Sequence, residues 1–184
     1  LAARLCGHAI VLLCKGVTAV RADWRGIAPV PRQRVYFANH TSNADLPMIW
    51  SVLPPSLRRQ TRPVAAADYW LRSRLRAFFG AEVFRAVLID RRPEARTEDP
   101  MSAILAGLDE GSSLIIFPEG NRNTTSAPLL PFKAGLYNIG QARPDVDLVP
   151  ARRQDGYSQD HSLYRRKADT WTKTNVATHI RDVS

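Results

Sequence analysis

His40 and Asp45 stand five positions apart in a polar stretch, residues 39–45 (NHTSNAD). In one regular helix this spacing would point the two side chains about 140° apart, so they can meet only across a bend before the helix. An Asp that accepts a hydrogen bond from one ring nitrogen of a His fixes its tautomer, and the other nitrogen can then act as a general base. The same spacing also fits a structural His beside a carboxylate at a helix N-terminus, and both interpretations stay open here.

A second polar cluster follows a strongly apolar run and has the sequence FPEGNR over residues 117–122. Gly120 allows a positive φ in a turn, which would place Glu119 and Arg122 beyond the end of the apolar run. The guanidinium of Arg122 could hold a phosphate through two hydrogen bonds, and Arg91, after another apolar run, is a second phosphate candidate. The alternatives are a surface salt bridge or a turn-capping pair for Glu119 and Arg122, and a solvated charge for Arg91.

The helices and strands that must position these residues are predicted from apolar runs and from the proline, glycine and capping residues that separate them. Strands are predicted at residues 34–38, 62–67, 83–89, 113–117 and 147–150, and helices at residues 45–53, 68–79, 100–111 and 132–142. This alternation predicts an α/β fold with a mostly parallel β-sheet flanked by helices. Because ligands bind beyond the carboxyl ends of such strands, the polar clusters after residues 38, 89 and 117 are expected to converge on one edge.

The N-terminal residues 1–22 are predicted to form an amphipathic helix, either packed on the surface of the domain or lying in a membrane interface. No segment reaches the roughly 20 apolar residues that a membrane-spanning helix needs. No small-residue cleavage pattern follows the apolar run, so a secretory signal is not supported. The chain begins with Leu1 rather than Met, so an upstream segment that carries a membrane anchor remains open.

The excess of basic residues indicates that the binding partner is anionic. The 184 residues hold 26 Lys and Arg against 17 Asp and Glu, a net charge of +9, which favours nucleic acid, an anionic membrane or a phosphorylated substrate. Nucleic acid is disfavoured because no RNP-like or GXXG signature is present and aromatic residues do not alternate with the basic ones. We therefore expect an anionic membrane surface. Two cysteines exclude a disulfide scaffold and a CxxC zinc site, and four scattered histidines argue against a metal centre.

Taken together, the motifs resemble those of the glycerolipid acyltransferase family, which includes 1-acylglycerol-3-phosphate acyltransferase, a lysophospholipid acyltransferase. Residues 39–45 resemble its NHxxxxD motif and residues 117–123 (FPEGNRN) its FPEGTRS block. Similar blocks in the family's order are residues 87–91 (VLIDR), 132–135 (FKAG) and 148–150 (LVP). Departures are Asn121 in place of Thr, Asn123 in place of Ser, and Arg85 where the middle block usually opens with Gly.

The resemblance implies a glycerol-3-phosphate acyltransferase-like fold and transfer of a fatty acyl group from acyl-CoA or acyl carrier protein. The acceptor would be a hydroxyl of a lysophospholipid such as 1-acylglycerol-3-phosphate, giving phosphatidic acid in phospholipid biosynthesis or remodelling. His40 would be the general base and Asp45 its orienting partner. The substrate-binding residues would be Asn39, Arg91, Glu119, Gly120 and Arg122. Neither a metal nor an organic cofactor is expected, and the protein would be membrane-associated, at the cytoplasmic face of the inner or plasma membrane.

Three parts are expected: an N-terminal interfacial helix at residues 1–25, an acyltransferase domain at 26–151, and a polar basic tail at 152–184 that we expect to be poorly ordered. Family members generally continue with further strand and helix after residue 150, so a truncated or frame-shifted ending is one hypothesis. The alternative function is then a catalytically impaired acyltransferase-like protein that binds anionic membrane lipid. A metal-dependent hydrolase using His40, Asp45, Asp90 and Glu119 is disfavoured because it has one usable histidine.

Overall fold

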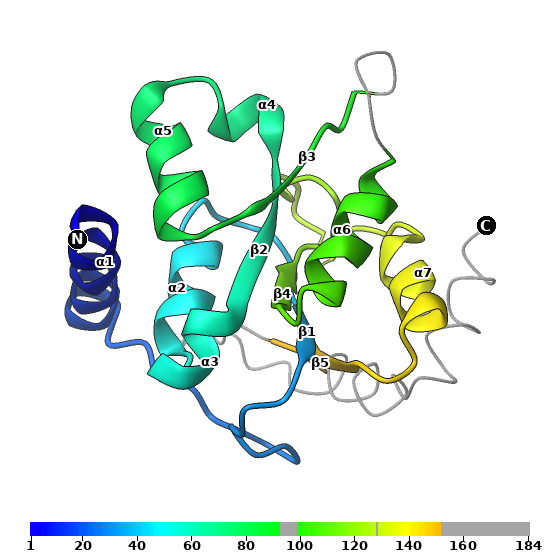
Figure 1. The fold of residues 1–184 in the computed structure, drawn as a ribbon, viewed down its shortest axis with the longest axis horizontal. Helices are drawn as coiled ribbons and strands as arrows, with labels where there is room; N and C mark the ends of the chain where they lie inside the picture. The colour runs from blue at the N-terminus through cyan, green and yellow to red at the C-terminus, as the bar shows by residue number, and fades with distance from the viewer. Residues whose placement is uncertain (93–98, 128, 152–184) are drawn as a thin grey trace.

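The computed structural model describes residues 1–92, 99–127 and 129–151. Its centre is one sheet of five strands: β1 (Arg34–Phe37), β2 (Thr61–Ala66), β3 (Val87–Ile89), β4 (Ser113–Ile116) and β5 (Asp147–Pro150). The strands lie in the order β3-β2-β4-β1-β5, and every pairing between them is parallel (Figure 1). The prediction of an α/β fold with a mostly parallel sheet is confirmed.

Helices cover both faces of this sheet (Figure 1). They are α1 (Ala2–Thr18), α2 (Asp45–Val52), α3 (Pro55–Gln60), α4 (Ala67–Trp70), α5 (Arg74–Phe78), the π-type turn η1 (Phe79–Val83), α6 (Pro100–Asp109) and α7 (Gly135–Ala142). Side chains of successive strand residues point to opposite faces, and β1 illustrates this: Val35 and Phe37 pack with residues of α6 and α7, whereas Tyr36 packs with residues of α2 and α3. Because both faces are covered, β1 and β4 are fully buried, and after a polar first residue, Arg34 or Ser113, both are apolar.

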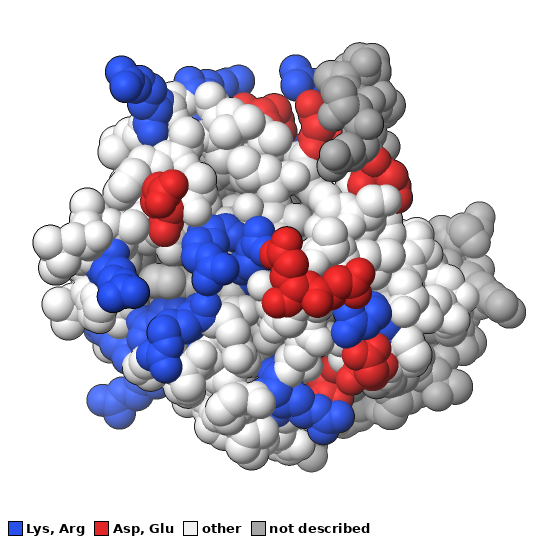
Figure 2. Space-filling model, in the orientation of Figure 1, with Lys and Arg blue, Asp and Glu red and all other residues white. Residues whose placement is uncertain are grey.

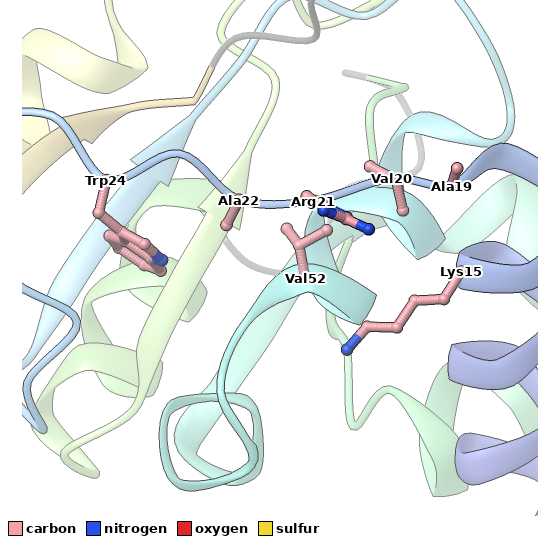
Figure 3. Close-up of a pocket in the computed structure, with 7 residues that line it drawn as sticks. All are labelled: Lys15, Ala19, Val20, Arg21, Ala22, Trp24 and Val52. Atoms are coloured by element: carbon pink, nitrogen blue, oxygen red, sulfur yellow. The ribbon is translucent and has the colours of Figure 1, made fainter.

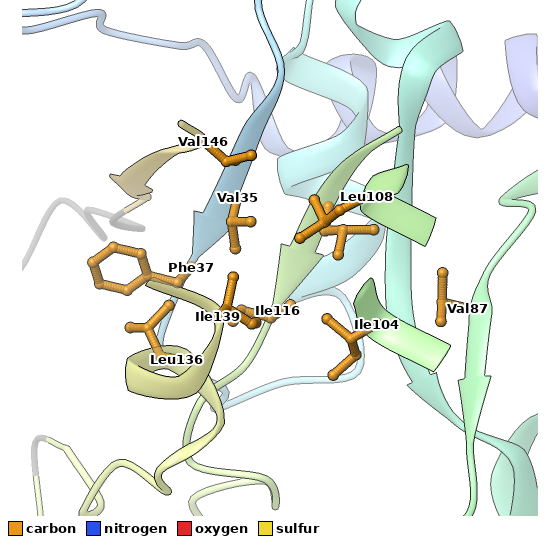
Figure 4. Close-up of a cluster of buried hydrophobic side chains, with 10 residues drawn as sticks. Val35, Phe37, Val87, Ile104, Leu108, Ile116, Leu136, Ile139 and Val146 are labelled. Atoms are coloured by element: carbon orange, nitrogen blue, oxygen red, sulfur yellow. The ribbon is translucent and has the colours of Figure 1, made fainter. Parts of the chain in front are cut away.

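The core therefore has two halves, one on each face of the sheet. Figure 4 shows the half under α6 and α7, where strand side chains meet Ile104, Leu108, Leu136 and Ile139 of these helices. The other half gathers Trp50, Leu57 and Phe84 around Tyr36 and Ile115 of the strands, with part of α1 packed against it. Gly7 allows α1 to approach closely, since a Cβ there would lie 3.3 Å from the Trp50 ring.

The chain leaves β1 and β4 in opposite directions, although these two strands are neighbours. After β1 it runs through α2 and α3 to β2, on the β4 side, and after β4 it runs through α7 to β5, on the β1 side. The two connections also cover opposite faces of the sheet. A crevice is left where such connections diverge, so the carboxyl ends of β1 and β4 form the topological switch point at which α/β proteins bind ligands.

Two predictions in the middle of the chain were wrong in detail. The helix predicted at residues 68–79 is split into α4 and α5, and the strand predicted at 83–89 begins only at Val87. Val83 and Phe84 are buried apolar residues, but they belong to η1 and its end, and Arg85 has a left-handed φ of 53° that interrupts extended backbone. The apolar residues Val83 and Phe84 were predicted to be in a strand because apolar residues are typical of buried strands, but burial does not require an extended backbone.

Helix ends account for the other differences. The helix predicted at residues 132–142 begins at Gly135, and the N-terminal helix ends at Thr18, where Ala19 takes a left-handed φ of 50°. The short helix α3 was not predicted, because Pro54 and Pro55 were interpreted only as a stop. A proline in the first turn has no N–H to lose and a φ suited to a helix, so the same pair also starts α3.

Helix α1 packs on the surface of the domain, and the interpretation of its other face as a membrane interface stays a prediction. One face packs on the domain, while Leu5, Leu12, Leu13 and Val17 are exposed on the other. Within the described residues, no helix is both long and apolar enough to cross a bilayer. The division of the chain at residues 25 and 151 stays a prediction, and the predicted tail at 152–184 lies outside the described residues.

Candidate active site

His40 and Asp45 meet at the carboxyl end of β1. The Nδ1 atom of His40 lies 3.0 Å from Oδ2 of Asp45, because the chain bends after β1 and Asp45 is the first residue of α2. This is the bend that the sequence spacing required. No other residue in the described ranges hydrogen-bonds to the His40 ring, whose side chain is 24% exposed. The Nε2 atom is therefore accessible to a substrate.

Asp45 is held as an ionised carboxylate despite being 4% exposed. Besides His40, its Oδ2 accepts the backbone N–H groups of Thr41 and Ser42, each at 2.7 Å. Burial by itself would raise the pKa of Asp45, but the hydrogen bonds from His40, Ser42 and Thr41 outweigh it and place the pKa below its ordinary value. The charged carboxylate favours the proton on Nδ1 of His40, which leaves Nε2 as the basic nitrogen.

Glu119 joins the loop after β1 to the turn after β4. Its Oε1 accepts the backbone N–H of His40 at 3.3 Å, and the residue is 3% exposed. Burial raises the pKa of Glu119; amides of His40 and Leu130 offset this only in part, and the nearby charge of Asp45 adds to the rise. Its Oε2 is buried with no hydrogen-bond partner among the described residues. A substrate contact by Glu119 stays a prediction, whereas the structure shows a carboxylate that holds the backbone of His40.

Two further contacts hold the His40 loop from the β4 side. The Phe117 ring stacks on the imidazole, with ring centroids 4.4 Å apart and an interplanar angle of 22°. The backbone N–H of Asn123 donates to the carbonyl of His40 at 2.6 Å. Asn123 is itself fixed, because its side chain donates to the Ala127 carbonyl and accepts from Thr125. The orientation of the imidazole is therefore determined by both strands of the switch point.

Arg91 connects the ends of three strands at the same edge. Its guanidinium makes two hydrogen bonds to Asp68, from Nε to Oδ1 at 3.2 Å and from Nη2 to Oδ2 at 2.9 Å. Its Nη1 donates to Oδ1 of Asn121 at 3.3 Å. Arg91 also lowers the pKa of Asp68 through these hydrogen bonds. The long arginine side chain thus brings the cluster after β3 to the turn after β4, as the expected convergence requires.

Gly120 and Arg122 occupy the turn after β4. Gly120 has a φ of 72°, so the backbone conformation favours glycine, and the end of the flexible Lys133 side chain lies over it, 2.7 Å from where a Cβ would stand. Arg122 is exposed and makes no side-chain hydrogen bond or ion pair with the described part of the chain. Arg122 directly follows Asn121, which Arg91 contacts, and an exposed guanidinium of this kind is suited to an anionic ligand.

The remaining predicted residues are placed as follows. Asn39 is half-buried directly before His40, between the end of β1 and the bend. Asp90 pairs with Arg92 at 2.9 Å. Across residues 1–92, 99–127 and 129–151, His, Cys, Asp and Glu side chains form no group of three or more that could hold a metal ion. The four residues of the hydrolase alternative are therefore not assembled as a metal site in this part of the chain.

Sequence reasoning gave Asp68 no part in this region, and it placed Phe117, Asn121 and Lys133 in motifs without predicting their contacts. Asp68 directly follows the predicted second strand, so the rule that pointed to His40 and Arg91, a polar residue after the carboxyl end of a strand, could have found it. The contacts of Asn121 and Lys133 depend on how turns approach one another. The stacking of Phe117 depends on the neighbouring order of β1 and β4, which no local pattern encodes.

Comparison with known proteins gives three matches. A family model described as Acyltransferase matches residues 21–153. Taffazin from Dictyostelium discoideum is 33% identical over 128 residues, which are 65% of this chain and 42% of that protein, so the chain spans less than half the length of this curated relative. The crystal structure of the 1-acyl-sn-glycerophosphate (LPA) acyltransferase PlsC from Thermotoga maritima aligns with a TM-score of 0.58 at 16% identity, over 96% of this chain and 80% of that one. At this identity the likeness shows a common fold alone.

Proposed function

The chain belongs to the acyltransferase family, and from this premise we propose that it transfers a fatty acyl group from an acyl thioester to a hydroxyl of a lysophospholipid. The donor would be acyl-CoA or acyl carrier protein, and the acceptor a molecule such as 1-acylglycerol-3-phosphate, so that phosphatidic acid is the product. Support comes from the fold shared with a solved 1-acyl-sn-glycerophosphate acyltransferase and from the motifs at the switch point.

The observation that carries this proposal is the His40–Asp45 pair. A hydroxyl is a weak nucleophile, and a positioned base that removes its proton accelerates attack by about 10²–10⁴-fold. His40 has the geometry of such a base: Nδ1 is hydrogen-bonded to an ionised Asp45 and Nε2 is accessible. The pair also lies where an α/β sheet binds its ligands.

The proposed reaction needs no covalent enzyme intermediate. Nε2 of His40 takes the proton of the acceptor hydroxyl while its oxygen attacks the thioester carbonyl carbon, and Asp45 stabilises the imidazolium that forms. The tetrahedral intermediate then collapses, the carbon–sulfur bond breaks, and the thiolate receives the proton from His40. The products are an ester and a free thiol, and His40 returns to its neutral form.

The acceptor phosphate would be held by the arginines of the same edge. Arg122 offers a guanidinium that no other described residue pairs with, whereas Arg91 is already oriented by Asp68 and Asn121. Gly120, Asn39 and Glu119 would shape this part of the site, Gly120 by letting the turn pass close to Lys133. Guanidinium groups match phosphate through paired hydrogen bonds, so these residues would set affinity for a phosphorylated acceptor.

We also propose that the protein works on a membrane surface, at the cytoplasmic face of the inner or plasma membrane. The exposed stripe of α1 includes Leu12, Leu13 and Val17, which are 73%, 64% and 75% exposed. Figure 2 shows Lys and Arg side chains gathered over the half of one face that holds α1, α2, α3 and α5, while basic and acidic side chains alternate toward α7. An apolar stripe beside basic charge is the combination that binds anionic bilayers.

The test is product formation from defined substrates. Purified protein is incubated with 1-acylglycerol-3-phosphate and either acyl-CoA or acyl carrier protein, and phosphatidic acid is measured by mass spectrometry. Monoacylglycerol, which lacks the phosphate, serves as the matched acceptor. We expect phosphatidic acid and little acylation of monoacylglycerol. A protein that binds anionic vesicles but acylates neither acceptor would support the impaired, lipid-binding alternative instead.

A further inference from the structure

A hollow of about 500 Å³ lies between the end of α1, the connector that follows it and the end of α2. Its lining residues are Lys15, Ala19, Val20, Arg21, Ala22, Trp24 and Val52 (Figure 3). The left-handed turn at Ala19, whose N–H donates to the Lys15 carbonyl, ends α1 and turns the chain into the connector. As a result, Lys15 of the helix and Arg21 of the connector border one space.

The two cations of the hollow have no counter-charge in the described part of the chain. Neither Lys15 nor Arg21 forms an ion pair there, and the nearest carboxylate along the connector, Asp23, is paired with Arg25 at 2.6 Å. Two like charges beside one space repel each other, and an anion between them would turn that repulsion into attraction. The electrostatics of the hollow therefore favour an anionic group.

The other lining residues have apolar side chains, and the exposed apolar stripe of α1 lies close by. They include Val52 and the half-buried Trp24, which packs against the core on the α2 face. Leu12 lies three positions before Lys15 on the same helix, so the exposed apolar stripe borders the cation directly. A ligand that satisfies both parts has an anionic head and an apolar chain.

We propose that this hollow binds the phosphate head group of an anionic phospholipid from the membrane surface, with its acyl chain along the exposed stripe of α1. Tryptophan and the stems of Lys and Arg are suited to this depth, because each has an apolar body and a polar end. Bound in this way, one lipid would hold α1 at a defined position on the bilayer, which non-specific electrostatic attraction to anionic lipids would not do.

This site is separate from the candidate active site. Val52 ends α2 and Asp45 begins it, and the eight-residue helix between them spans about 12 Å. The lipid in the hollow would therefore be an anchor and not the acyl acceptor. The proposal rests on the proposed membrane association and not on the proposed acyl transfer, since a head-group site can exist whether or not His40 acts as a base.

The experiment measures binding of the full chain to vesicles of phosphatidylcholine with or without phosphatidylglycerol, by co-sedimentation. Lys15→Gln/Arg21→Gln removes the two cations of the hollow, and Arg25→Gln/Arg59→Gln removes two exposed arginines that do not line it. Ala22→Trp fills the hollow without a change in charge, and Ala28→Trp places the same side chain elsewhere on the connector. Circular dichroism checks that each variant is folded.

We expect Lys15→Gln/Arg21→Gln and Ala22→Trp each to weaken binding to phosphatidylglycerol vesicles about tenfold, and the two controls to stay within about threefold of wild type. Equal losses in the charge control, or wild-type binding by Ala22→Trp, would overturn the proposal. Displacement of the protein from vesicles by inorganic phosphate, at matched ionic strength, would also overturn it by assigning the hollow to a soluble anion. Acylation of a monomeric short-chain acceptor should stay at the wild-type rate in all four variants, and complete absence of that activity in wild type would count against the proposed function alone.

Discussion

The two sides of the candidate site are built differently. On the β1 side, the residues are held by many contacts: Oδ2 of the buried Asp45 accepts three donors, and His40 is held by stacking and by both of its backbone groups. On the phosphate side, Arg91 and Arg122 are long, exposed side chains on turns. A base must be placed to within fractions of an ångström before the reaction, whereas an anion can be met by side chains that adjust to it. We infer that the β1 side sets the rate of acyl transfer and that the phosphate side sets the affinity for the acceptor.

Replacing His40 should give the largest effect. His40→Ala removes the base but leaves Asp45 its hydrogen bonds from Thr41 and Ser42, so we expect kcat to fall by about 10²–10⁴-fold with little loss of stability. Steady-state kinetics and thermal unfolding measure the two quantities. If His40→Ala kept the wild-type turnover, the contacts on the β1 side would have a structural role only.

Gly120 tests how far the turn between the two sides depends on its backbone. Gly120→Ala forces a residue with a Cβ into a left-handed conformation, whereas the flexible end of Lys133 can move aside, so we expect a loss of about 1–3 kcal/mol in the free energy of unfolding from the backbone strain. Denaturant titration measures it. Gly16→Ala, at an exposed helical position with open space around it, is the matched control and should be neutral or stabilising.

Replacing Arg122 tests whether the phosphate side sets the affinity for the acceptor. Arg122→Ala should raise the KM for 1-acylglycerol-3-phosphate by about tenfold and change kcat much less, because it removes a charge-assisted contact made by substrate and transition state alike. The KM of the thioester donor is the internal control. A fall in kcat at unchanged KM would place Arg122 on the catalytic side and break the comparison.

Glu119 should give the smallest effect, and its sign depends on pH. Its pKa in the folded state lies above the ordinary value of 4.5, so the folded protein loses stability as the pH rises through and beyond that value. Glu119→Gln keeps an acceptor for the His40 N–H and removes this cost. We expect its Tm to exceed that of wild type at pH 7 by roughly 1–3 °C and the gain to shrink toward pH 4. A gain that grows on acidification would contradict the assigned direction.

Much of this arrangement could be predicted from the sequence, because the relevant signals are local. The apolar runs gave all five strands, and the rule that ligands meet parallel strands at their carboxyl ends gave His40, Arg91 and Glu119 a common edge. The bend that joins His40 to Asp45 followed from their spacing alone. These inferences needed only the backbone period and the position of polar residues after strands.

What could not be predicted depends on strand order and on the approach of turns. That β4 lies beside β1, so that Phe117 stacks on His40, is a property of the whole sheet. Val83 and Phe84 were predicted to be strand residues because buried residues are apolar in a turn such as η1 as well as in a strand. The burial of Glu119 was missed for the opposite reason: a charged residue in a turn is usually solvated, and here the His40 loop covers it.

The central claim, that His40 and Asp45 act as one unit in general-base catalysis, is tested most directly by a double-mutant cycle. The measurement is kcat for transfer from acyl-CoA to 1-acylglycerol-3-phosphate by wild type, His40→Ala, Asp45→Asn and the double variant, each shown to be folded by circular dichroism. The account predicts that Asp45→Asn alone lowers kcat strongly, and that the double variant is no slower than His40→Ala, because Asp45 acts only through the imidazole. Near-normal turnover by folded His40→Ala, or losses that multiply in the double variant, would contradict it.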